Sequence, residues 1–393
     1  MEPNPWVARA KRAAVAVAAL LVVAYLGGSW HYSNVLARDL LAPSSGEPTR
    51  DIEVLAIDGG TIALSRTERS ERDGVFGVAG EGTYGQVADV VDVGDDQVTR
   101  VFREVEGEFA VGDMVALDQY AYLGNPLTAL GLPFQEVRVG GELGVLPAWL
   151  VDGAADTWVV IVHGKGVNER RQALRLIPML NEAGYPALVV SYRNDLGAPP
   201  AESGRHGWGY PEWRDLEAGL QFADLRGAES FVLVGFSMGG EIVATFLHES
   251  EASARAGAPL TDLVRAVVFD SPVLDLEGTV DAEAERRGIP GILTSTAEAI
   301  ARLRFDLDWR ALDQVARAGE FDPAVPVLLL HGTDDSTVPF ELSAAFAERV
   351  AHVTFEPVDG ADHVELWNAD PARYERLVAD FLARVAPVEL TDG

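Results

Sequence analysis

Three patterns of apolar and polar positions follow one another along this 393-residue chain. The first is an uninterrupted apolar segment, and the second is a series of short apolar runs between glycine and aspartate turns. The third is a regular alternation of apolar runs with amphipathic segments. Helices repeat every 3.6 residues and strands every two, so a change of pattern indicates a change of structure. We therefore expect three structurally different parts.

The N-terminal pattern is typical of a membrane anchor. Residues 13–28 read AAVAVAALLVVAYLGG, carry no charge and follow three basic residues, and Trp30 and Tyr32 suit a membrane interface. We expect residues 1–42 to be a single-pass anchor that is not cleaved. A cleaved signal peptide and a buried helix of a soluble protein are the alternatives. The positive-inside rule then places the N-terminus in the cytoplasm and the remainder of the chain outside the cell membrane.

The second pattern predicts a small β-rich accessory module over residues 50–125, after a linker at residues 43–50. Its short runs are rich in Val, Ile, Thr and Tyr, and its acidic residues fall mainly in turns, where solvated loops are expected. We see no chemistry in this module. The predicted strands are Ile52–Ile57, Thr61–Leu64, Gly74–Val78, Gln86–Val93, Gln97–Phe102 and Met114–Tyr120.

The third pattern predicts an α/β domain over residues 134–388. Uniformly apolar strands that alternate with amphipathic helices indicate a mostly parallel sheet covered on both faces, and an opening hairpin around Gly140-Gly141 makes this sheet mixed. The predicted strands are Val137–Val139, Val145–Val151, Trp158–His163, Ala187–Tyr192, Ser230–Gly235, Val264–Asp270, Val325–His331 and Val353–Pro357. The predicted helices are Arg171–Ala183, Trp213–Leu225, Gly239–Glu249, Phe340–Val350 and Pro371–Val385.

One segment, residues 274–322, interrupts this alternation between two predicted strands. It is far longer than the usual connection of about 2–6 residues, and it contains a predicted helix at Thr294–Leu303. An insertion at this place lies over the carboxyl edge of the sheet. We expect it to form a small lid over a substrate pocket.

Composition excludes several classes of function. The chain has 61 acidic and 31 basic residues and a net charge of −30, which repels the phosphates of DNA and RNA, so nucleic acid is not expected as a partner. It has no cysteine, which excludes disulfides, thiolate metal sites and a cysteine nucleophile.

A candidate nucleophile, Ser237, stands in the sequence Gly235-Phe236-Ser237-Met238-Gly239 between a predicted strand and a predicted helix. The sharp turn of a nucleophile elbow needs small residues on both sides of the serine, because side chains there would collide with the neighbouring strand or helix. A pattern of five residues is weak by itself. Its position between strand and helix is the context that the motif requires.

A serine hydroxyl needs a base and an orienting acid, which follow it in the order acid, then histidine, on this type of fold. His363 follows the last predicted strand and is the expected base. Asp335, after the strand that ends at His331, is the expected acid, and its neighbour Asp334 is the alternative. Asp270 and Asp362 are interpreted as acceptors that stabilise loops.

An acyl-transfer site also needs hydrogen-bond donors for the oxyanion. The expected donors are the backbone N–H groups of Met238, which follows the serine, and of Lys165, in the loop His163-Gly164-Lys165-Gly166. The Lys165 side chain is interpreted as solvated, with recognition of a substrate carboxylate or phosphate as the alternative.

The segments HGKG, GFSMGG, HGTDDSTVP and ADH together resemble the α/β-hydrolase superfamily over about residues 134–388. The resemblance is greatest to the branch of monoglyceride lipases, serine-aminopeptidase-like hydrolases and membrane-anchored Bem46-like proteins, with this chain as a bacterial member. The family's HGxxDxxVP pattern places the acid at Asp335. Residues 191–193 and 213–216 are also similar to that branch, whereas the β-rich module does not match it.

The resemblance implies hydrolysis of an ester, thioester or amide through an acyl-enzyme, with no metal or organic cofactor. We predict a serine hydrolase that cleaves carboxylic esters, with a small acyl substrate as its partner. An aminopeptidase-like amide hydrolase and a non-catalytic hydrolase-like binding protein are the alternatives. The sequence predicts neither the substrate's acyl and leaving groups nor the oligomeric state.

Overall fold

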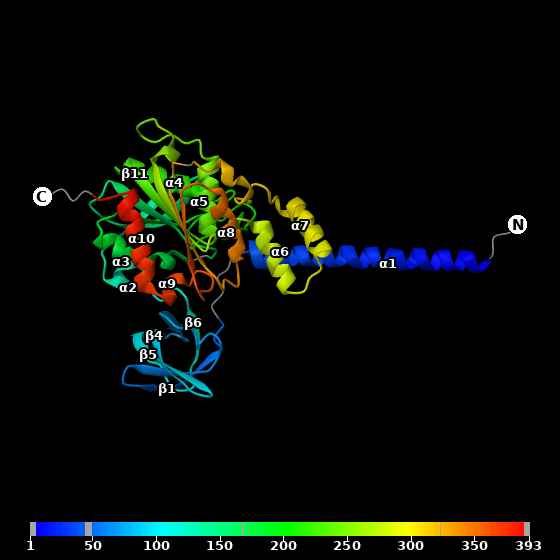
Figure 1. Cartoon of the computed structure of the whole chain (residues 1–393), viewed down its shortest axis with the longest axis horizontal. Coiled ribbons are helices and arrows are strands. Elements are labelled where there is room, and N and C mark those ends of the chain that lie inside the picture. Colours follow the sequence, from blue (N-terminus) through cyan, green and yellow to red (C-terminus); the bar gives the residue numbers. More distant parts are fainter. Residues whose placement is uncertain (1–4, 44–48, 167–168, 323, 389–393) are drawn as a thin grey trace.

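The computed structural model describes residues 5–43, 49–166, 169–322 and 324–388. A long helix projects from the body of the molecule, and a β-barrel lies beside the domain that contains the large sheet (Figure 1). Residues 44–48, which make up most of the predicted linker, lie outside the described residues.

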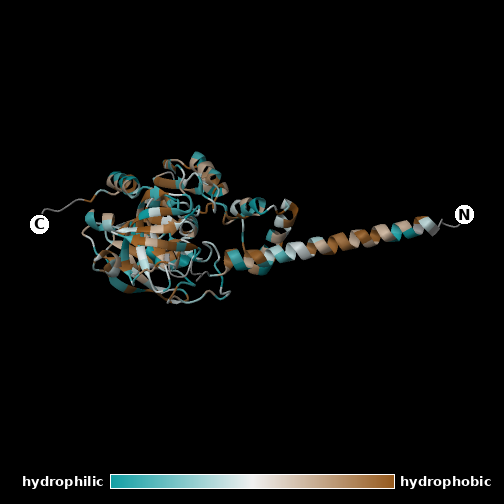
Figure 2. Cartoon of the chain, turned by 90° about the horizontal axis from the view of Figure 1, so that it is seen from below, coloured by the Kyte–Doolittle hydropathy of each residue, from teal (hydrophilic) through white to brown (hydrophobic). Residues whose placement is uncertain are grey.

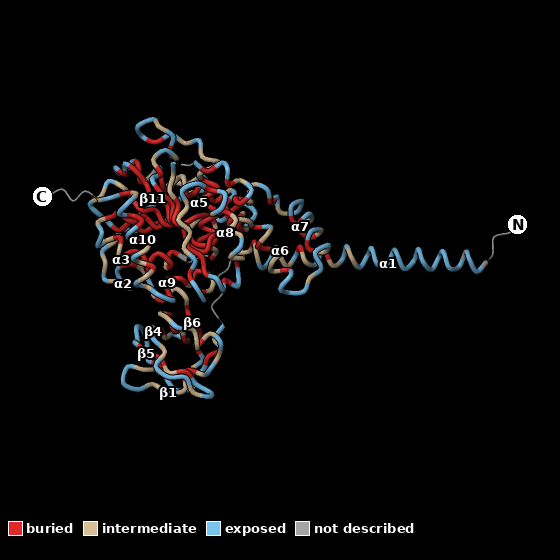
Figure 3. Tube along the Cα trace, viewed as in Figure 1, coloured by how far each residue is buried: buried red, intermediate tan, exposed pale blue. Residues whose placement is uncertain are grey.

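The projecting helix α1, Pro5–Val35, continues into a short π-helix, η1, Leu36–Leu41. Its outer turns are exposed and largely apolar (Figures 2 and 3). Over Arg9–Leu41 it is long and apolar enough to span a membrane by length and composition. The prediction of an apolar N-terminal helix is confirmed.

The barrel is a closed sheet of six strands in the order β1-β2-β5-β4-β3-β6. Closure comes from β6, which pairs with both β1 and β3. Inside, the fully buried Arg100 guanidinium donates hydrogen bonds to the carbonyl oxygens of Ser70, Arg72, Gly74 and Ala88. The strands are β1 Ile52–Asp58, β2 Thr61–Ser65, β3 Phe76–Ala79, β4 Tyr84–Val93, β5 Gln97–Glu106 and β6 Met114–Asp118.

The large sheet has eight strands in the order β14-β13-β12-β11-β9-β10-β8-β7. The strands from β9 to β14 pair in parallel, whereas β8 is antiparallel to both β7 and β10, so the predicted mixed sheet is confirmed. Its strands are β7 Gln135–Gly141, β8 Gly144–Val151, β9 Thr157–Val162, β10 Ala187–Val190, β11 Ser230–Phe236, β12 Val264–Asp270, β13 Val327–Gly332 and β14 Val353–Val358.

Two details of the predicted elements are wrong. The hairpin turns at Glu142-Leu143, because Gly141 still pairs with Gly144, whose positive φ a glycine tolerates. The single helix expected from residue 171 is instead a 3₁₀-helix, η2, Glu169–Arg175, followed by α3, Ile177–Glu182. Pro178 occupies the first turn of α3, and a proline is accommodated there but not inside a continuous helix.

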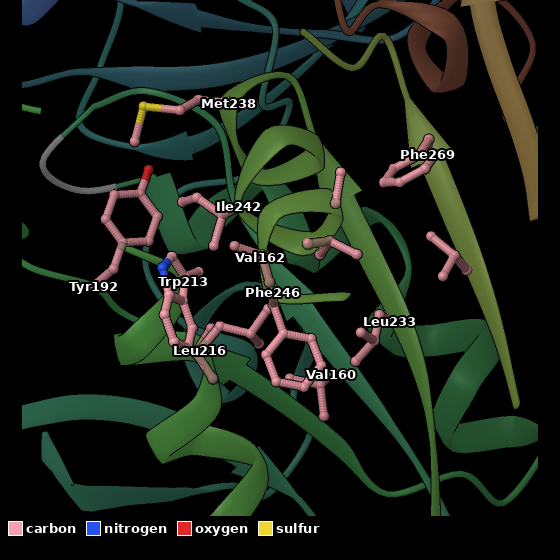
Figure 4. Close-up of a cluster of buried hydrophobic side chains, with 14 of the residues drawn as sticks. Val160, Val162, Tyr192, Trp213, Leu216, Leu233, Met238, Ile242, Phe246 and Phe269 are labelled. Carbon is pink, nitrogen blue, oxygen red and sulfur yellow. The ribbon is translucent and has the colours of Figure 1, made fainter. Parts of the chain in front are cut away.

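Helices pack on both faces of the sheet, and the buried apolar residues form a separate cluster on each face. One cluster includes Met238 and Ile242 of α5, which pack near Tyr192 and Trp213 (Figure 4). These contacts hold α5 against the sheet directly behind the predicted nucleophile. The remaining helices are α2 Pro126–Leu130, α4 Trp213–Leu225, α5 Met238–Glu249, η3 Leu260–Leu263, α8 Phe340–Arg349, α9 Leu366–Ala369 and α10 Pro371–Val385.

The insertion at residues 274–322 contains two helices, α6 Leu276–Arg286 and α7 Gly291–Phe305, and a 3₁₀-helix, η4, Ala316–Glu320. Only α7 was predicted. On α6, Leu276 and Val280 belong to a core cluster, and Val280 and Ala284 also line a cavity. The helix α7 lies against the inner part of α1, and α6 packs against α7 (Figure 1).

Candidate functional site

Ser237 occupies a strained turn between β11 and α5. Its backbone has φ +50° and ψ −116°, a conformation that costs a non-glycine residue about 1–3 kcal/mol and therefore needs support. The Ser237 N–H donates to the carbonyl oxygen of Asp270 at 3.0 Å, and the Ser237 carbonyl accepts from Gly240 N–H at 2.9 Å. These bonds hold the hydroxyl at the carboxyl end of the sheet.

The two glycines of the pentapeptide allow this turn to pack closely. A Cβ atom at Gly239 would lie 2.2 Å from the carbonyl oxygen of Val162, in the neighbouring strand β9. A Cβ atom at Gly235 would lie 2.7 Å from the carbonyl oxygen of Gly239, in the helix. The steric reason for expecting small residues on both sides of Ser237 therefore holds here.

The structure brings His363 and Asp335 to Ser237. His363 Nε2 lies 2.9 Å from Ser237 Oγ, and His363 Nδ1 lies 2.8 Å from Asp335 Oδ2. With Nδ1 protonated toward the carboxylate, Nε2 is left as the acceptor for the serine proton. The alternative acid, Asp334, is exposed, and its carboxylate accepts a hydrogen bond from Thr333.

Asp335 is held as an ionised acceptor. Burial raises the pKa of its carboxyl, but hydrogen bonds from His331 and His363 outweigh that effect and hold the pKa well below its usual value. The N–H groups of Thr337 and Val338 donate to the other oxygen, Oδ1, at 2.8 and 2.7 Å. A carboxylate with these donors is fixed in place and remains charged at neutral pH.

Sequence reasoning missed the role of His331, which lies fully buried near the end of β13. Its Nε2 lies 3.0 Å from Asp335 Oδ2, and its Nδ1 lies 2.7 Å from Ser343 Oγ. The same carboxylate oxygen thus faces two imidazole rings. The signal was available, since a histidine four residues before the expected acid, at the end of an apolar strand, is placed to contact it.

Two carboxylates near His363, those of Asp362 and Asp270, accept hydrogen bonds. Asp362 Oδ1 accepts from the N–H groups of Ser336 and His363 at 2.8 and 2.7 Å, and so joins this loop to the loop of the acid. Asp270, which is fully buried, accepts from the Tyr374 hydroxyl at 2.8 Å. Both carboxylates act as the loop-stabilising acceptors that were expected.

The HGKG loop lies beside the serine. A Cβ atom at Gly164 would lie 3.2 Å from Ser237 Cβ, and the loop is held by Gln172 and Tyr192, whose side chains bond the Gly164 N–H and carbonyl at 2.7 and 2.5 Å. Met238 is the first residue of α5, directly after Ser237. That the N–H groups of Lys165 and Met238 bind an oxyanion stays a prediction.

The interpretation of the Lys165 side chain as solvated is wrong. Its ammonium donates to the carbonyl oxygen of Asp39, in η1, at 2.6 Å, and burial lowers the pKa of this group. The local sequence could not show this contact, because its partner Asp39 lies more than a hundred residues away in the chain. The carbonyl of Asp39 is in the last turn of η1, where carbonyls have no partner within the helix.

A cavity of about 350 Å³ opens in front of Ser237, within the range of small-ligand pockets. Most of its lining is apolar. The insertion contributes Thr279, Val280, Glu283, Ala284, Arg286, Arg287, Ile289, Thr294 and Ala297, and the N-terminal segment contributes Tyr32, Val35, Leu36, Asp39 and Leu40.

The comparisons with solved structures agree with this architecture. An esterase from Pyrococcus furiosus is similar in two crystal forms, each with a TM-score of 0.51: one is 21% identical and covers 67% of this chain and 95% of that chain, and the other is 23% identical and covers 67% and 94%. The part with the large sheet has the α/β-hydrolase fold. An esterase from Thermogutta terrifontis is similar with a TM-score of 0.49 and 20% identity over 67% of this chain and 96% of that chain.

The barrel has its own match. A family model described as a domain of unknown function, DUF8805, matches residues 53–118, which run from β1 to the end of β6. The barrel and the α/β-hydrolase domain are therefore separate matches within one chain.

Proposed function

We propose that this protein is a serine hydrolase that cleaves carboxylic esters. The observation that carries the proposal is the continuous relay of hydrogen bonds from Ser237 through His363 to Asp335, set at a strained strand–helix turn. A similar fold in known esterases is consistent with it, but the fold alone does not assign the chemistry.

In the proposed reaction, His363 Nε2 takes the proton of Ser237 Oγ as this oxygen attacks the ester carbonyl carbon. The oxyanion accepts hydrogen bonds from the N–H groups of Met238 and Lys165. The C–O bond of the ester then breaks, and the imidazolium gives its proton to the leaving alkoxide. His363 then takes a proton from water as the water oxygen attacks the carbonyl carbon of the acyl-enzyme. The C–O bond to Ser237 breaks, the acid is released, and the imidazolium returns the proton to Ser237 Oγ.

The electrostatics of Asp335 support this cycle. The imidazolium of His363 forms and disappears in each half of the reaction, and a carboxylate that is already ionised and immobilised stabilises it without rearranging. The low pKa of the Asp335 carboxyl keeps the negative charge available throughout the neutral pH range.

A fluorophosphonate probe tests the proposal, because it reacts only with an activated serine. We expect it to label the full-length protein at Ser237, with hydrolysis of p-nitrophenyl esters inhibited in proportion. Absence of labelling, beside a control hydrolase that is labelled, would favour a non-catalytic binding protein. Faster cleavage of aminoacyl anilides than of esters would instead favour a peptidase.

In the cell, α1 is proposed to anchor the enzyme in the membrane with the α/β-hydrolase domain outside the cytoplasm. The basic residues at positions 9–12 precede the apolar segment, as the positive-inside rule requires for that orientation. Protease added to intact spheroplasts should degrade the domain. Protection until the membrane is opened would reverse the orientation, and recovery of the full-length protein in the soluble fraction would overturn the anchor.

The insertion at residues 274–322 is proposed to be the lid of the site. Its helices α6 and α7 supply one wall of the cavity in front of Ser237, and this wall combines apolar side chains such as Val280 with charged ones such as Glu283. The lining of the cavity as a whole is mostly apolar, which favours partly apolar acyl groups over small charged ones.

A further inference from the structure

The cavity in front of Ser237 has a second wall that is not part of the α/β-hydrolase domain. Tyr32 and Val35 of α1 and Leu36 and Leu40 of η1 line it together with residues of the insertion. The helix that is proposed to anchor the protein therefore also shapes the space that a substrate would occupy.

Contacts along α7 place the lid helix against the membrane-spanning segment. Near the start of α7, the Tyr25 hydroxyl donates to the Ile292 carbonyl oxygen at 3.1 Å and bonds the Thr296 hydroxyl. Toward its end, Arg304 bonds Ser33 Oγ at 2.5 Å and lies over the Trp30 ring at 4.1 Å. Figure 1 shows α7 alongside the inner part of α1.

These contacts set the depth of the lid relative to a bilayer. Tyr25 belongs to the uncharged run at residues 13–28, so the start of α7 reaches the level of the apolar segment. Ile292, at that level, is 68% exposed, and burial of its side chain in lipid would be favourable. Ile289, three residues earlier, lines the cavity. The start of α7 therefore lies both beside the cavity and at the level of the bilayer.

The depth of the cavity relative to the bilayer also follows from the positions of its lining residues along α1. A helix rises about 1.5 Å per residue, so Tyr32 lies about 6 Å beyond Gly28, and Val35 about 10 Å beyond it. The polar layer on each side of a bilayer is about 5–8 Å thick. The cavity thus begins within the interfacial layer of the membrane.

We infer that the inner end of the anchor contacts the substrate, and that the substrate is an acyl ester resident in the bilayer. Its acyl chain would lie between η1 and the helices α6 and α7. This inference rests on the proposed ester hydrolysis. A lipid ester would enter the cavity beside Ile289, which lines it three residues before the exposed Ile292.

The test uses the full-length protein in vesicles of ether-linked phosphatidylcholine, which contain no carboxylic ester of their own. Monooleoylglycerol and oleoyl lysophosphatidylcholine are added in separate arms, and p-nitrophenyl acetate serves as a water-soluble ester. We expect release of oleate in at least one lipid arm as well as cleavage of the soluble ester. Cleavage of the soluble ester alone overturns the inference but leaves the proposed hydrolase; cleavage of neither overturns both.

A matched pair of variants tests the pocket wall. Ala297 lines the cavity from α7, whereas Ala299, two residues along the same helix, is exposed. Ala297→Phe should lower the ratio of oleoyl to acetyl ester cleavage by about tenfold or more, because the ring fills the acyl space. Ala299→Phe should leave the ratio within about twofold. Equal ratios in the two variants would contradict a substrate chain at this wall.

A separate set of contacts gives the barrel a role at the site. Arg72, in the loop before β3, forms ion pairs with Asp362 and Glu365, each at 2.8 Å. These two carboxylates stand on either side of His363 in the chain. These ion pairs connect the barrel to the loop that carries the proposed base.

The barrel contacts this region closely at a second point. The Val75 N–H donates to the Asn368 carbonyl oxygen at 2.9 Å, and the Asn368 amide donates back to the Val75 carbonyl oxygen at 2.6 Å. A Cβ atom at Gly74 would lie 2.0 Å from the same Asn368 oxygen, so only a glycine permits this approach. These contacts therefore fix the position of Arg72 relative to the loop that carries His363.

The geometry assigns Arg72 as a positioning residue for His363. Its guanidinium fixes Asp362 Oδ2, and Asp362 Oδ1 receives the N–H groups of His363 and Ser336. Through one carboxylate, the barrel aligns the loop of the base with the loop of the acid. The pKa of the Asp362 carboxyl is lowered despite its burial, by these N–H groups and by Arg72, so it remains charged for both contacts.

Arg72→Gln tests this role, with Arg72→Lys as the conservative variant and Arg103→Gln, on the exposed barrel surface, as the control. With rates normalised to sites titrated by fluorophosphonate, Arg72→Gln should lower kcat about tenfold and change KM by less than about twofold. Arg72→Lys should recover part of kcat. An unchanged kcat per titrated site, or an equal loss in Arg103→Gln, would overturn the assignment.

Discussion

Replacing Ser237 with alanine should lower kcat for ester hydrolysis by about 10⁶-fold, to the level that binding and oxyanion contacts alone sustain. The reason is that His363 Nε2 would then face a methyl group and no acyl-enzyme could form. The measurement is hydrolysis of p-nitrophenyl esters together with fluorophosphonate labelling, with both signals expected to disappear.

The matched control for this variant is Ser295→Ala, which changes an exposed serine on α7. It should retain labelling and activity within about twofold. Persistence of labelling in Ser237→Ala would place the reactive nucleophile elsewhere. Thermal unfolding of both variants, compared with the parent protein, separates a loss of chemistry from a loss of folding.

Replacing Asp335 with asparagine should lower kcat by about 10⁴-fold. An amide cannot stabilise the imidazolium of His363, and it can donate a hydrogen bond to Nδ1, which would leave Nε2 protonated and unable to accept the serine proton. The loss should appear in kcat with little change in KM, because Asp335 lies behind the histidine and not in the cavity in front of Ser237.

Asp334→Asn is the decisive control, because both carboxylates follow the same strand in the sequence. Asp334 is exposed and bonded to Thr333, whereas Asp335 receives two imidazoles and two backbone N–H groups. We expect Asp334→Asn to keep kcat within about threefold. A larger loss in Asp334→Asn than in Asp335→Asn would reverse the assignment of the acid.

The sequence alone predicted those elements whose pattern is local. The apolar strands and amphipathic helices of the α/β domain were evident from periodicity, and helices α4 and α10 begin and end where they were predicted. That Ser237, Asp335 and His363 lie together was also predictable, since each follows the end of a strand in a sheet whose parallel topology brings these ends to one edge.

Prediction failed where a local pattern depends on distant partners. The buried side of α6 packs on core residues from other parts of the chain and lines a cavity with them, and the break before α3 depends on one proline within an otherwise helical pattern. The role of the Lys165 side chain could not be predicted, since its partner is the carbonyl of Asp39. No periodicity in either segment encodes that contact.

The sequence was sufficient to predict the apolar N-terminal helix, the mixed sheet and the order of the candidate nucleophile, acid and base, because these depend on residue types within short windows. Only the tertiary structure shows that Arg72 of the barrel pairs with Asp362 beside His363, and that the end of α1 lines the cavity. Each of these contacts joins segments that are far apart in the chain, so no local sequence pattern predicts it. They arise only when burial of apolar surface brings the segments together.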